Sequence, residues 1–317
     1  MMVSELAIAT SNLTKQFERH IAVNKLELKV EAGEVYGLIG PNGAGKTTLI
    51  RMLAAVEEPT AGEIHIYGDR LLRDNSHPRL KQKLGYLPDD FPLYEDLNVW
   101  DYLDYFARLY HLRLPHRRRR LQEVLELVQL TSKQDSNIKT LSRGMKQRLS
   151  LARTILHDPL LLLLDEPVSG LDPIARMQFR EVVKTLQNVG MTVLISSHVL
   201  SDLAELCTSV GIMELGFLVE STSLKELYER LSHQQIIIKT LGDLTKLEQE
   251  LKGFSQVEEW EILSQKNSLR VNFSGGDEES AELLKHLVHQ GIPIADFHCT
   301  QEDLESIFLN LGHKQAS

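Results

Sequence analysis

A glycine-rich loop between an expected strand and an expected helix is the feature that most constrains this chain. The segment from Gly40 to Thr48 reads GPNGAGKTT and matches all eight positions of the pattern G-x-x-x-x-G-K-[ST]. Residues 34–39 are typical of a buried strand, and residues 49–55 are typical of the first turns of a helix. In that setting, backbone N–H groups and the helix N-terminus point at phosphate oxygens. A βα turn without a ligand is the alternative, but the full match favours a nucleoside triphosphate site.

Within this loop, two side chains have distinct expected roles. Lys46 can reach the β- and γ-phosphates, and the Thr47 hydroxyl can bind Mg²⁺. We therefore predict that a nucleoside triphosphate and Mg²⁺ bind here. The nucleotide contacts expected from the loop are Gly40, Pro41, Asn42, Gly43, Ala44, Gly45, Lys46, Thr47 and Thr48.

Polar residues also follow two further apolar runs of the strand type. Asp165 and Glu166 come directly after residues 160–164, and His198 follows the run at 192–195 after two serines. Strands of a parallel sheet end at one edge, so these side chains are expected beside the loop. Asp165 would complete the Mg²⁺ sphere, and Glu166 would deprotonate the attacking water. His198 would donate a hydrogen bond to the γ-phosphate. Purely structural roles remain the alternative for each, most of all for the histidine.

Composition excludes several other classes of protein. The chain has 317 residues, enough for one large or two ordinary domains, and a net charge of −9. That charge argues against broad nucleic-acid binding. Its longest purely aliphatic run, residues 160–164, is far shorter than the roughly 20 residues of a membrane-spanning helix. The start of the chain shows no secretory signal, and its two cysteines have no metal-binding spacing. We expect a reducing cytosol, with any membrane contact made through a partner.

The order of expected elements predicts an α/β fold in two domains. Strands are expected at residues 6–9, 26–30, 35–39, 64–67, 160–164 and 192–195, with a helix over 176–189. Alternation of strands and helices predicts a parallel sheet that is covered on both faces. A helical arm at about 91–158 is inserted between the loop and the next core strand. We assign residues 1–221 to this first domain.

Residues 222–317 are predicted to form a small accessory α+β domain. After a short helix at 224–231, the pattern is strand, helix, strand, strand, helix, strand and helix. This order predicts a ferredoxin-like sandwich. The elements are 236–239, 244–251, 257–263, 269–273, 280–290, 293–298 and 302–311.

Over residues 3–220 the chain resembles the ATP-binding subunits of ABC transporters, with the diagnostic motifs in the family order. Residues 141–148, LSRGMKQR, look like the signature, which in the family faces the γ-phosphate held by a second subunit. The resemblance therefore places Ser142 and Gly144 at the partner's nucleotide. Residues 169–172, SGLD, look like the D-loop that links the two sites. Phe17 stands where the family stacks an aromatic ring on adenine, although a core phenylalanine remains the alternative. The implied core is a mixed sheet with a helical arm.

Two positions depart from the family pattern. Arg143 replaces the usual glycine of the signature, as some drug- and polymer-export subfamilies tolerate. Asp89 replaces a glutamine that the family uses as a Mg²⁺ ligand and hydrogen-bond donor. The aspartate keeps an oxygen ligand but adds a charge that repels the γ-phosphate. Our hypothesis is an unusually steep dependence of ATP binding on Mg²⁺, unless Asp89 points away from the site.

Two further segments are candidates for contacts with partners. Residues 91–115 follow the Asp89 loop and are rich in aromatic side chains; in the family, this surface accepts a helix of the membrane subunit. Most of these aromatics are expected to pack within the arm. Residues 117–120 are four consecutive arginines, interpreted either as a solvated helix start or as a face for anionic lipid or an acidic partner.

The resemblance implies an ATPase subunit that forms a dimer around ATP and drives a separate integral-membrane permease, with a lean to export. A homodimer is feasible, since one chain supplies one loop and one signature. Such a subunit would be cytoplasmic and peripheral to the cell membrane. The tail at 302–309 resembles the closing helix of exporters with separate permeases. The alternative is a soluble ATPase of this type that remodels a ribosome or nucleic acid. The accessory domain is expected to be structural or dimer-stabilising, with ligand sensing as another possibility.

Overall fold

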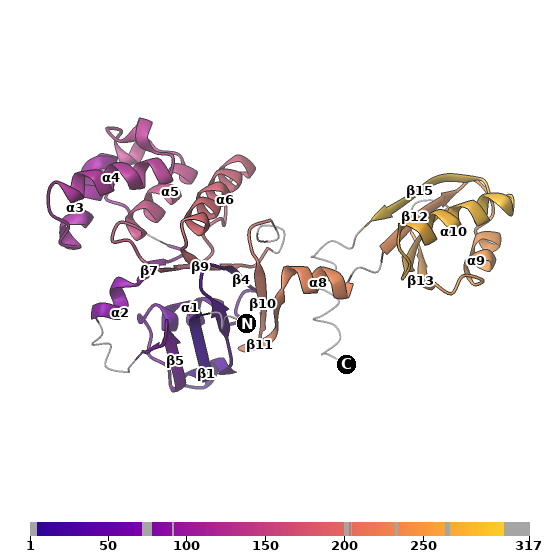
Figure 1. Ribbon diagram of the computed structural model, residues 1–317, viewed down its shortest axis with the longest axis horizontal. Helices are drawn as coiled ribbons and strands as arrows, with labels where there is room; N and C mark the ends of the chain where they lie inside the picture. Colours follow the sequence, from indigo (N-terminus) through magenta and orange to yellow (C-terminus); the bar gives the residue numbers. More distant parts are fainter. Residues whose placement is uncertain are drawn as a thin grey trace. The chain divides into compact units, whose positions relative to one another are not determined.

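The computed structural model describes residues 5–71, 78–90, 92–199, 203, 205–231, 234–263 and 267–300. The chain divides into two compact units, Met1–Leu224 and Lys225–Ser317, which are described here one at a time. Figure 1 shows the ribbon of both units.

An antiparallel sheet opens the first unit. Strand β1 (Leu6–Phe17) pairs with β2 (His20–Leu26), β3 (Lys29–Glu31) and β5 (Ala61–Ile66), and β6 (Asp69–Arg70) lies at the edge beside β5. The predicted single strand at 26–30 is wrong, because the chain breaks there between β2 and β3. The Thr10 hydroxyl is the physical reason. It donates to the Leu26 carbonyl at 3.0 Å and accepts from the Leu28 N–H at 2.8 Å, replacing the regular ladder.

The core sheet is largely parallel. Its strand order is β11-β10-β4-β9-β8-β7, and only β11 runs antiparallel to its neighbour. Every residue of β4, β8 and β9 is buried, which explains their continuous apolar sequences. The strands are β4 (Val35–Ile39), β7 (Leu84–Leu87), β8 (Leu161–Leu164), β9 (Thr192–Ser197), β10 (Ser209–Glu214) and β11 (Phe217–Ser223).

Different elements cover the two faces of this sheet. Helix α1 (Lys46–Leu53) and the antiparallel sheet form one apolar core with it, to which Leu38, Leu49 and Leu163 contribute. Helices α5 (Arg143–Thr154) and α6 (Pro173–Asn188) lie on the opposite side (Figure 1). Because β4 and its neighbours run parallel, their carboxyl ends lie at one edge of the sheet, and the glycine-rich loop begins at that edge.

The helical arm follows β7, with the short helix α2 (Pro78–Gln82) just before that strand. It comprises α3 (Val99–Leu109), α4 (His116–Leu127), two 3₁₀ turns at Thr131–Lys133 and Ile138–Thr140, and α5. We expected no core strand between the loop and the arm. This is corrected by β7, a core strand that lies after the loop and before the arm. The four residues of β7 were not recognised as a strand in the sequence, because polar residues follow them directly.

The arginine run at the start of α4 is partly built into the arm. The Arg117 guanidinium lies 2.7 Å from the Asp104 carboxylate. Arg120 donates to the carbonyls of Ile155 at 2.7 Å and Leu156 at 3.2 Å, so it satisfies acceptors at the end of α5. Two of the four arginines thus stabilise the packing of α4, while Arg118 and Arg119 are exposed.

The aromatic side chains of the arm form a cluster. Phe106 packs against Tyr94, Tyr102 and Tyr105, with ring centroids 4.9–5.9 Å apart. Tyr102 is fully buried, whereas Tyr94, Tyr105 and Tyr110 keep 41–50% of their surface exposed. Part of the cluster is therefore core, and part is available at the surface.

In its described part, the second unit is a four-stranded antiparallel sheet on which α9 (Leu244–Leu251) and α10 (Asp277–His289) pack, and α8 (Leu224–Leu231) precedes it. Its elements are α8, which starts at the boundary, β12 (Gln234–Thr240), α9, β13 (Val257–Ile262), β14 (Ser268–Phe273), α10 and β15 (Ile294–Thr300). The strand order is β13-β14-β12-β15. Ile236, Val271 and Phe273 meet Leu247 and Leu283 of the helices in its core. The helix expected at 302–311 lies outside the described residues.

Candidate active site

The glycine-rich loop joins β4 to α1, and its shape depends on glycine at three positions. Gly43 and Gly45 have φ angles of +86° and +103°, which disfavour other residues. A Cβ on Gly40 would lie 2.2 Å from the Met213 carbonyl oxygen. The loop holds the buried Lys46, whose Nζ donates to the carbonyls of Gly40 at 2.7 Å and Pro41 at 3.3 Å.

A cleft of about 330 Å³ lies above this loop. It is lined by Phe17, His20, Ala22, Asn42, Gly43, Ala44, Gly45, Lys46, Thr47, Thr48, Asp89 and Glu166. All but His20 and Ala22 were expected at a nucleotide. These two lie on β2 opposite the loop, and no motif marks them in the sequence. Phe17 is 42% exposed at the cleft, so it is not a core residue, and the Lys15 ammonium lies 4.8 Å from its ring centre.

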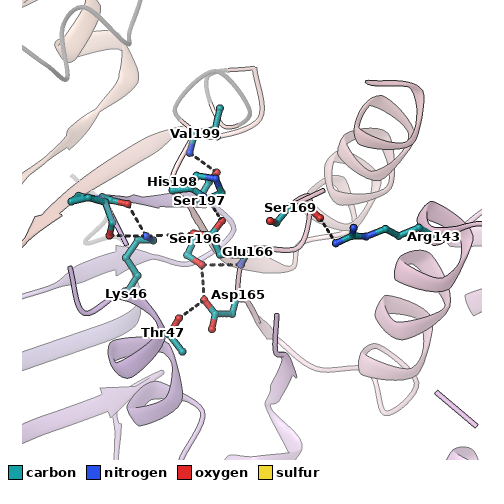
Figure 2. Close-up of polar contacts among 12 residues, drawn as sticks. Lys46, Thr47, Arg143, Asp165, Glu166, Ser169, Ser196, Ser197, His198 and Val199 are labelled. Atoms are coloured by element: carbon teal, nitrogen blue, oxygen red, sulfur yellow. Dashed lines mark hydrogen bonds and ion pairs between the residues drawn. The ribbon is translucent and has the colours of Figure 1, made fainter. Parts of the chain in front are cut away.

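Asp165 follows β8 and is held by two hydroxyl groups. Its Oδ1 accepts from Ser196 Oγ at 2.8 Å and from Thr47 Oγ1 at 3.2 Å (Figure 2). The residue is 1% exposed, and this burial raises the pKa of its carboxyl group against the opposing effect of the two hydrogen bonds. The nearby charges of Asp89 and Glu166 raise the pKa further. A buried carboxylate with this surplus of negative charge favours a cation.

Ser196 is a site residue that the sequence analysis missed. Besides its bond to Asp165, its Oγ accepts from the Glu166 backbone N–H at 3.0 Å. One buried hydroxyl on β9 therefore fixes two successive residues of the neighbouring strand end. Its position two residues before His198 was the available signal, since alternate residues of a strand share a face.

Glu166 connects the loop lysine to the histidine. Its Oε1 lies 3.4 Å from Lys46 Nζ, and its Oε2 lies 2.8 Å from His198 Nδ1. Its backbone has φ +47°, a left-handed conformation that is uncommon for glutamate. The carboxylate thus points into the cleft between a cation and an imidazole.

The residues present fit a magnesium ion. Thr47 Oγ1 and Asp165 Oδ1 are hard oxygen ligands 3.2 Å apart, and both face the loop. Among the described residues, no group of three or more His, Cys, Asp or Glu side chains forms a metal site. Mg²⁺ requires no such cage, because it is commonly held by one or two protein oxygens together with substrate phosphates and waters.

Asp89 lies on the wall of the same cleft. Its charge is one of the causes of the raised Asp165 pKa, and it also contributes to the pKa of Tyr86, which burial raises to about 12. The position is therefore electrically coupled to the strand end that carries Asp165.

Ser142 and Gly144 do not line the cleft of their own chain. Ser142 caps α5, with its Oγ accepting from the Met145 N–H at 3.3 Å. Gly144 is buried where α5 meets α6, and a Cβ there would lie 2.6 Å from the Ala175 Cβ. Close packing of two helices thus accounts for this glycine within one chain.

Comparison with known proteins places these features in a family. Residues 23–169 match the family model described as ABC transporter. The chain is 38% identical to the bacitracin transport ATP-binding protein BcrA of Enterococcus faecalis over 73% of each chain. It is 33% identical to the ABC transporter ATP-binding protein YcbN of Bacillus subtilis over 96% of each. It is 30% identical to the linearmycin resistance ATP-binding protein LnrL of the same species, over 96% of this chain and 97% of the relative.

Solved structures show the same fold. An ATP-binding subunit of an ABC transporter, 28% identical, superposes with a TM-score of 0.63 over 78% of this chain and 99% of that one. The cbiO1 structure from Clostridium perfringens, 24% identical, gives a TM-score of 0.64 over 71% and 91%. In the described part of the chain, no helix combines the length and hydrophobicity needed to cross a membrane.

Proposed function

This chain belongs to the family of ABC transporter ATP-binding proteins, and from that membership we propose that two copies close around two ATP molecules and drive a separate membrane permease. The chain is an ATPase whose hydrolysis is coupled to transport. The observation that carries the proposal is the division of the site. Lys46, Thr47 and Glu166 line one cleft, and Asp165 is hydrogen-bonded to Thr47, whereas Ser142 and Gly144 do not line it. A second copy would supply the missing signature.

The proposed chemistry assigns a role to each group around the cleft. Lys46 and the loop amides hold the phosphates, and Phe17 stacks on the adenine. Thr47 and Asp165 would hold Mg²⁺, which would neutralise charge at the phosphates. Glu166 accepts a proton from the attacking water, and His198 orients Glu166 and donates to the γ-phosphate.

We propose that the permease binds the surface between the arm and the core sheet. A hollow of about 260 Å³ there is lined by Tyr86, Tyr110, Arg153 and His157, among others. Aromatic and arginine side chains are the residues that most often anchor protein interfaces. Tyr86 lies three residues before Asp89, so movement at the nucleotide can reach the partner through this short segment.

Export is the proposed direction of transport. It is supported by the relatives named for bacitracin transport and linearmycin resistance, which align over most of this chain. We further propose an ATPase domain at 1–221 and an accessory domain at 222–317 with a ferredoxin-like fold. The β-α-β-β-α-β order and the all-antiparallel strand order β13-β14-β12-β15 support this assignment.

The test uses the purified chain and membranes from the cells that produce it. We expect Glu166→Gln to elute as a dimer with Mg²⁺ and ATP and as a monomer with ADP, while the wild-type chain hydrolyses ATP. Tagged chain from gently solubilised membranes should bring down one multi-span protein in fixed stoichiometry. Recovery of the tagged chain only with ribosomes or nucleic acid would disprove the proposed coupling to a permease. It would not affect the assignment as an ATPase.

A further inference from the structure

Arg143, the departure from the signature pattern, contacts the turn that carries Glu166. Its Nη2 donates to the Ser169 carbonyl at 3.1 Å (Figure 2). The guanidinium also lies against Gly170, where a Cβ would come within 2.6 Å of both terminal nitrogens. This turn is the observed contact of the Arg143 guanidinium. A glycine at 143, as in the family pattern, has no side chain to make this contact.

The turn between β8 and α6 is held at both ends. At the β8 end, Ser196 accepts from the Glu166 N–H at 3.0 Å. Within the turn, the Ser169 N–H donates to the Glu166 carbonyl at 3.1 Å. At the far end, the Ser169 carbonyl accepts from Arg143. Hydrogen bonds thus run from α5 through Ser169 to the backbone of Glu166.

This support matters because Glu166 has an unfavourable backbone. A left-handed φ of +47° persists in a glutamate only where the surroundings determine it. The direction of its carboxylate, toward Lys46 and His198, depends on that backbone angle. Loss of either support would let the turn relax and move the carboxylate away from the cleft.

The position of Arg143 is not explained by the stability of its own helix. It is the first residue of α5, directly after the cap Ser142. The N-terminal end of a helix carries a partial positive charge, and a cation there is unfavourable. Arg118 on α4, which is exposed as Arg143 is, makes no such contact with the described residues.

We propose that Arg143 is a positioning residue for Glu166: it ties the signature end of α5 to the turn at 166–170 within one subunit. This rests on the proposed role of Glu166 as the base. It adds that the signature segment acts on the cleft of its own chain as well as on that of a partner.

Hydrogen exchange and kinetics on the full-length chain test this. In Arg143→Ala we expect amide exchange across 166–171 to rise at least about threefold without nucleotide. The kcat for ATP should fall on the order of tenfold, with KM within about twofold, because a displaced base affects the chemical step more than binding. Arg143→Lys keeps the charge and a donor, so it should be intermediate in both. Arg118→Ala, the charge-matched control, should match the wild type.

Each other outcome overturns part of the inference. Unchanged exchange at 166–171 in Arg143→Ala would show that the turn is not held by Arg143. Faster exchange with an unchanged kcat would rule out positioning of Glu166. Equal effects of Arg143→Ala and Arg118→Ala would mean that the change in net charge, and not the contact with Ser169, causes the effect. An inactive wild-type chain would instead count against the proposed function, while the exchange comparison would still report on the contact.

Discussion

Lys46 Nζ and Glu166 Oε1 lie 3.4 Å apart, so the lysine expected to hold phosphate is paired with the carboxylate expected to activate water. Both side chains are largely buried, with 6% and 14% of their surface exposed. The same nitrogen also donates to the carbonyls of Gly40 and Pro41. A γ-phosphate must therefore compete with Glu166 for this cation, and its arrival releases the carboxylate.

Glu166→Gln should consequently bind ATP more tightly and hydrolyse it far more slowly. Loss of a partly buried ion pair worth about 1 kcal/mol predicts an affinity increase of about fivefold. Loss of the base predicts a kcat at least about 100-fold lower. Calorimetric titration with ATP and a phosphate-release assay measure the two effects. Glu126→Gln, an exposed carboxylate on α4, is the control, and a weaker affinity in Glu166→Gln would contradict competition for Lys46.

Asp89→Gln should make ATP binding less dependent on Mg²⁺. Asp89 lies in the cleft and adds negative charge beside Asp165 and the expected phosphates. Its neutral replacement removes a repulsion that Mg²⁺ otherwise screens, so ATP affinity at low Mg²⁺ should rise about fivefold. The measurement is the Kd of ATP across a Mg²⁺ titration. Asp90→Asn, the adjacent exposed carboxylate outside the cleft, should leave the dependence unchanged. An unchanged dependence in Asp89→Gln would disprove the hypothesis.

The residues that the sequence could place share one property: their position follows from a local pattern. Lys46 and Thr47 belong to one contiguous loop, and Asp165 directly follows a strand of four leucines. Parallel strands end at a common edge, so the chemistry of three distant segments could be brought together without knowing their contacts.

The residues that the sequence could not place depend on contacts across the fold. Ser196 is separated from Asp165 by 31 positions, and nothing local tells which neighbour its hydroxyl reaches. The Thr10 hydroxyl divides a predicted strand by bonding 16 and 18 residues away. Arg120 meets carbonyls 35 and 36 residues distant. Such contacts are fixed by packing, which the order of residue types does not specify.

Gly144→Ala should destabilise the first unit through the contact between α5 and α6. The added Cβ would lie 2.6 Å from the Ala175 Cβ, and the helices must separate to admit it. Overpacking of this kind costs about 1–3 kcal/mol. Unfolding of the first unit in urea measures the loss.

The companion variant Ala175→Gly tests whether that contact is the cause. Alone it should cost up to about 1 kcal/mol, as glycine does in helices. Combined with Gly144→Ala it should restore part of the stability, giving a favourable coupling of about 1 kcal/mol between the sites. Strict additivity of the two changes would mean that Gly144 is required for another reason.

His157 should make the stability of the protein sensitive to mild acid. Its Nε2 donates to the Leu84 carbonyl at 2.8 Å and its ring stacks on Tyr110. Its Nδ1 is buried and has no hydrogen-bond partner among the described residues. Burial, and to a smaller extent the charge of Arg120, lowers its pKa below the ordinary 6.5, although the bond to Leu84 opposes the shift. Protonation would add a charge and a second buried N–H.

The sign of the effect follows from which state binds the proton first. Below about pH 6.5 the unfolded chain protonates His157 before the folded chain does, so stability falls as the pH falls toward the lowered pKa. The stability contributed by the neutral ring is complete above about pH 6.5, where the ring is neutral in both states. His157→Gln keeps a donor for Leu84 but cannot titrate, so its melting temperature should decline less on acidification. His116→Gln, at the exposed start of α4, should decline as the wild type does. An equal decline in all three proteins would mean that His157 is protonated without cost in the folded state.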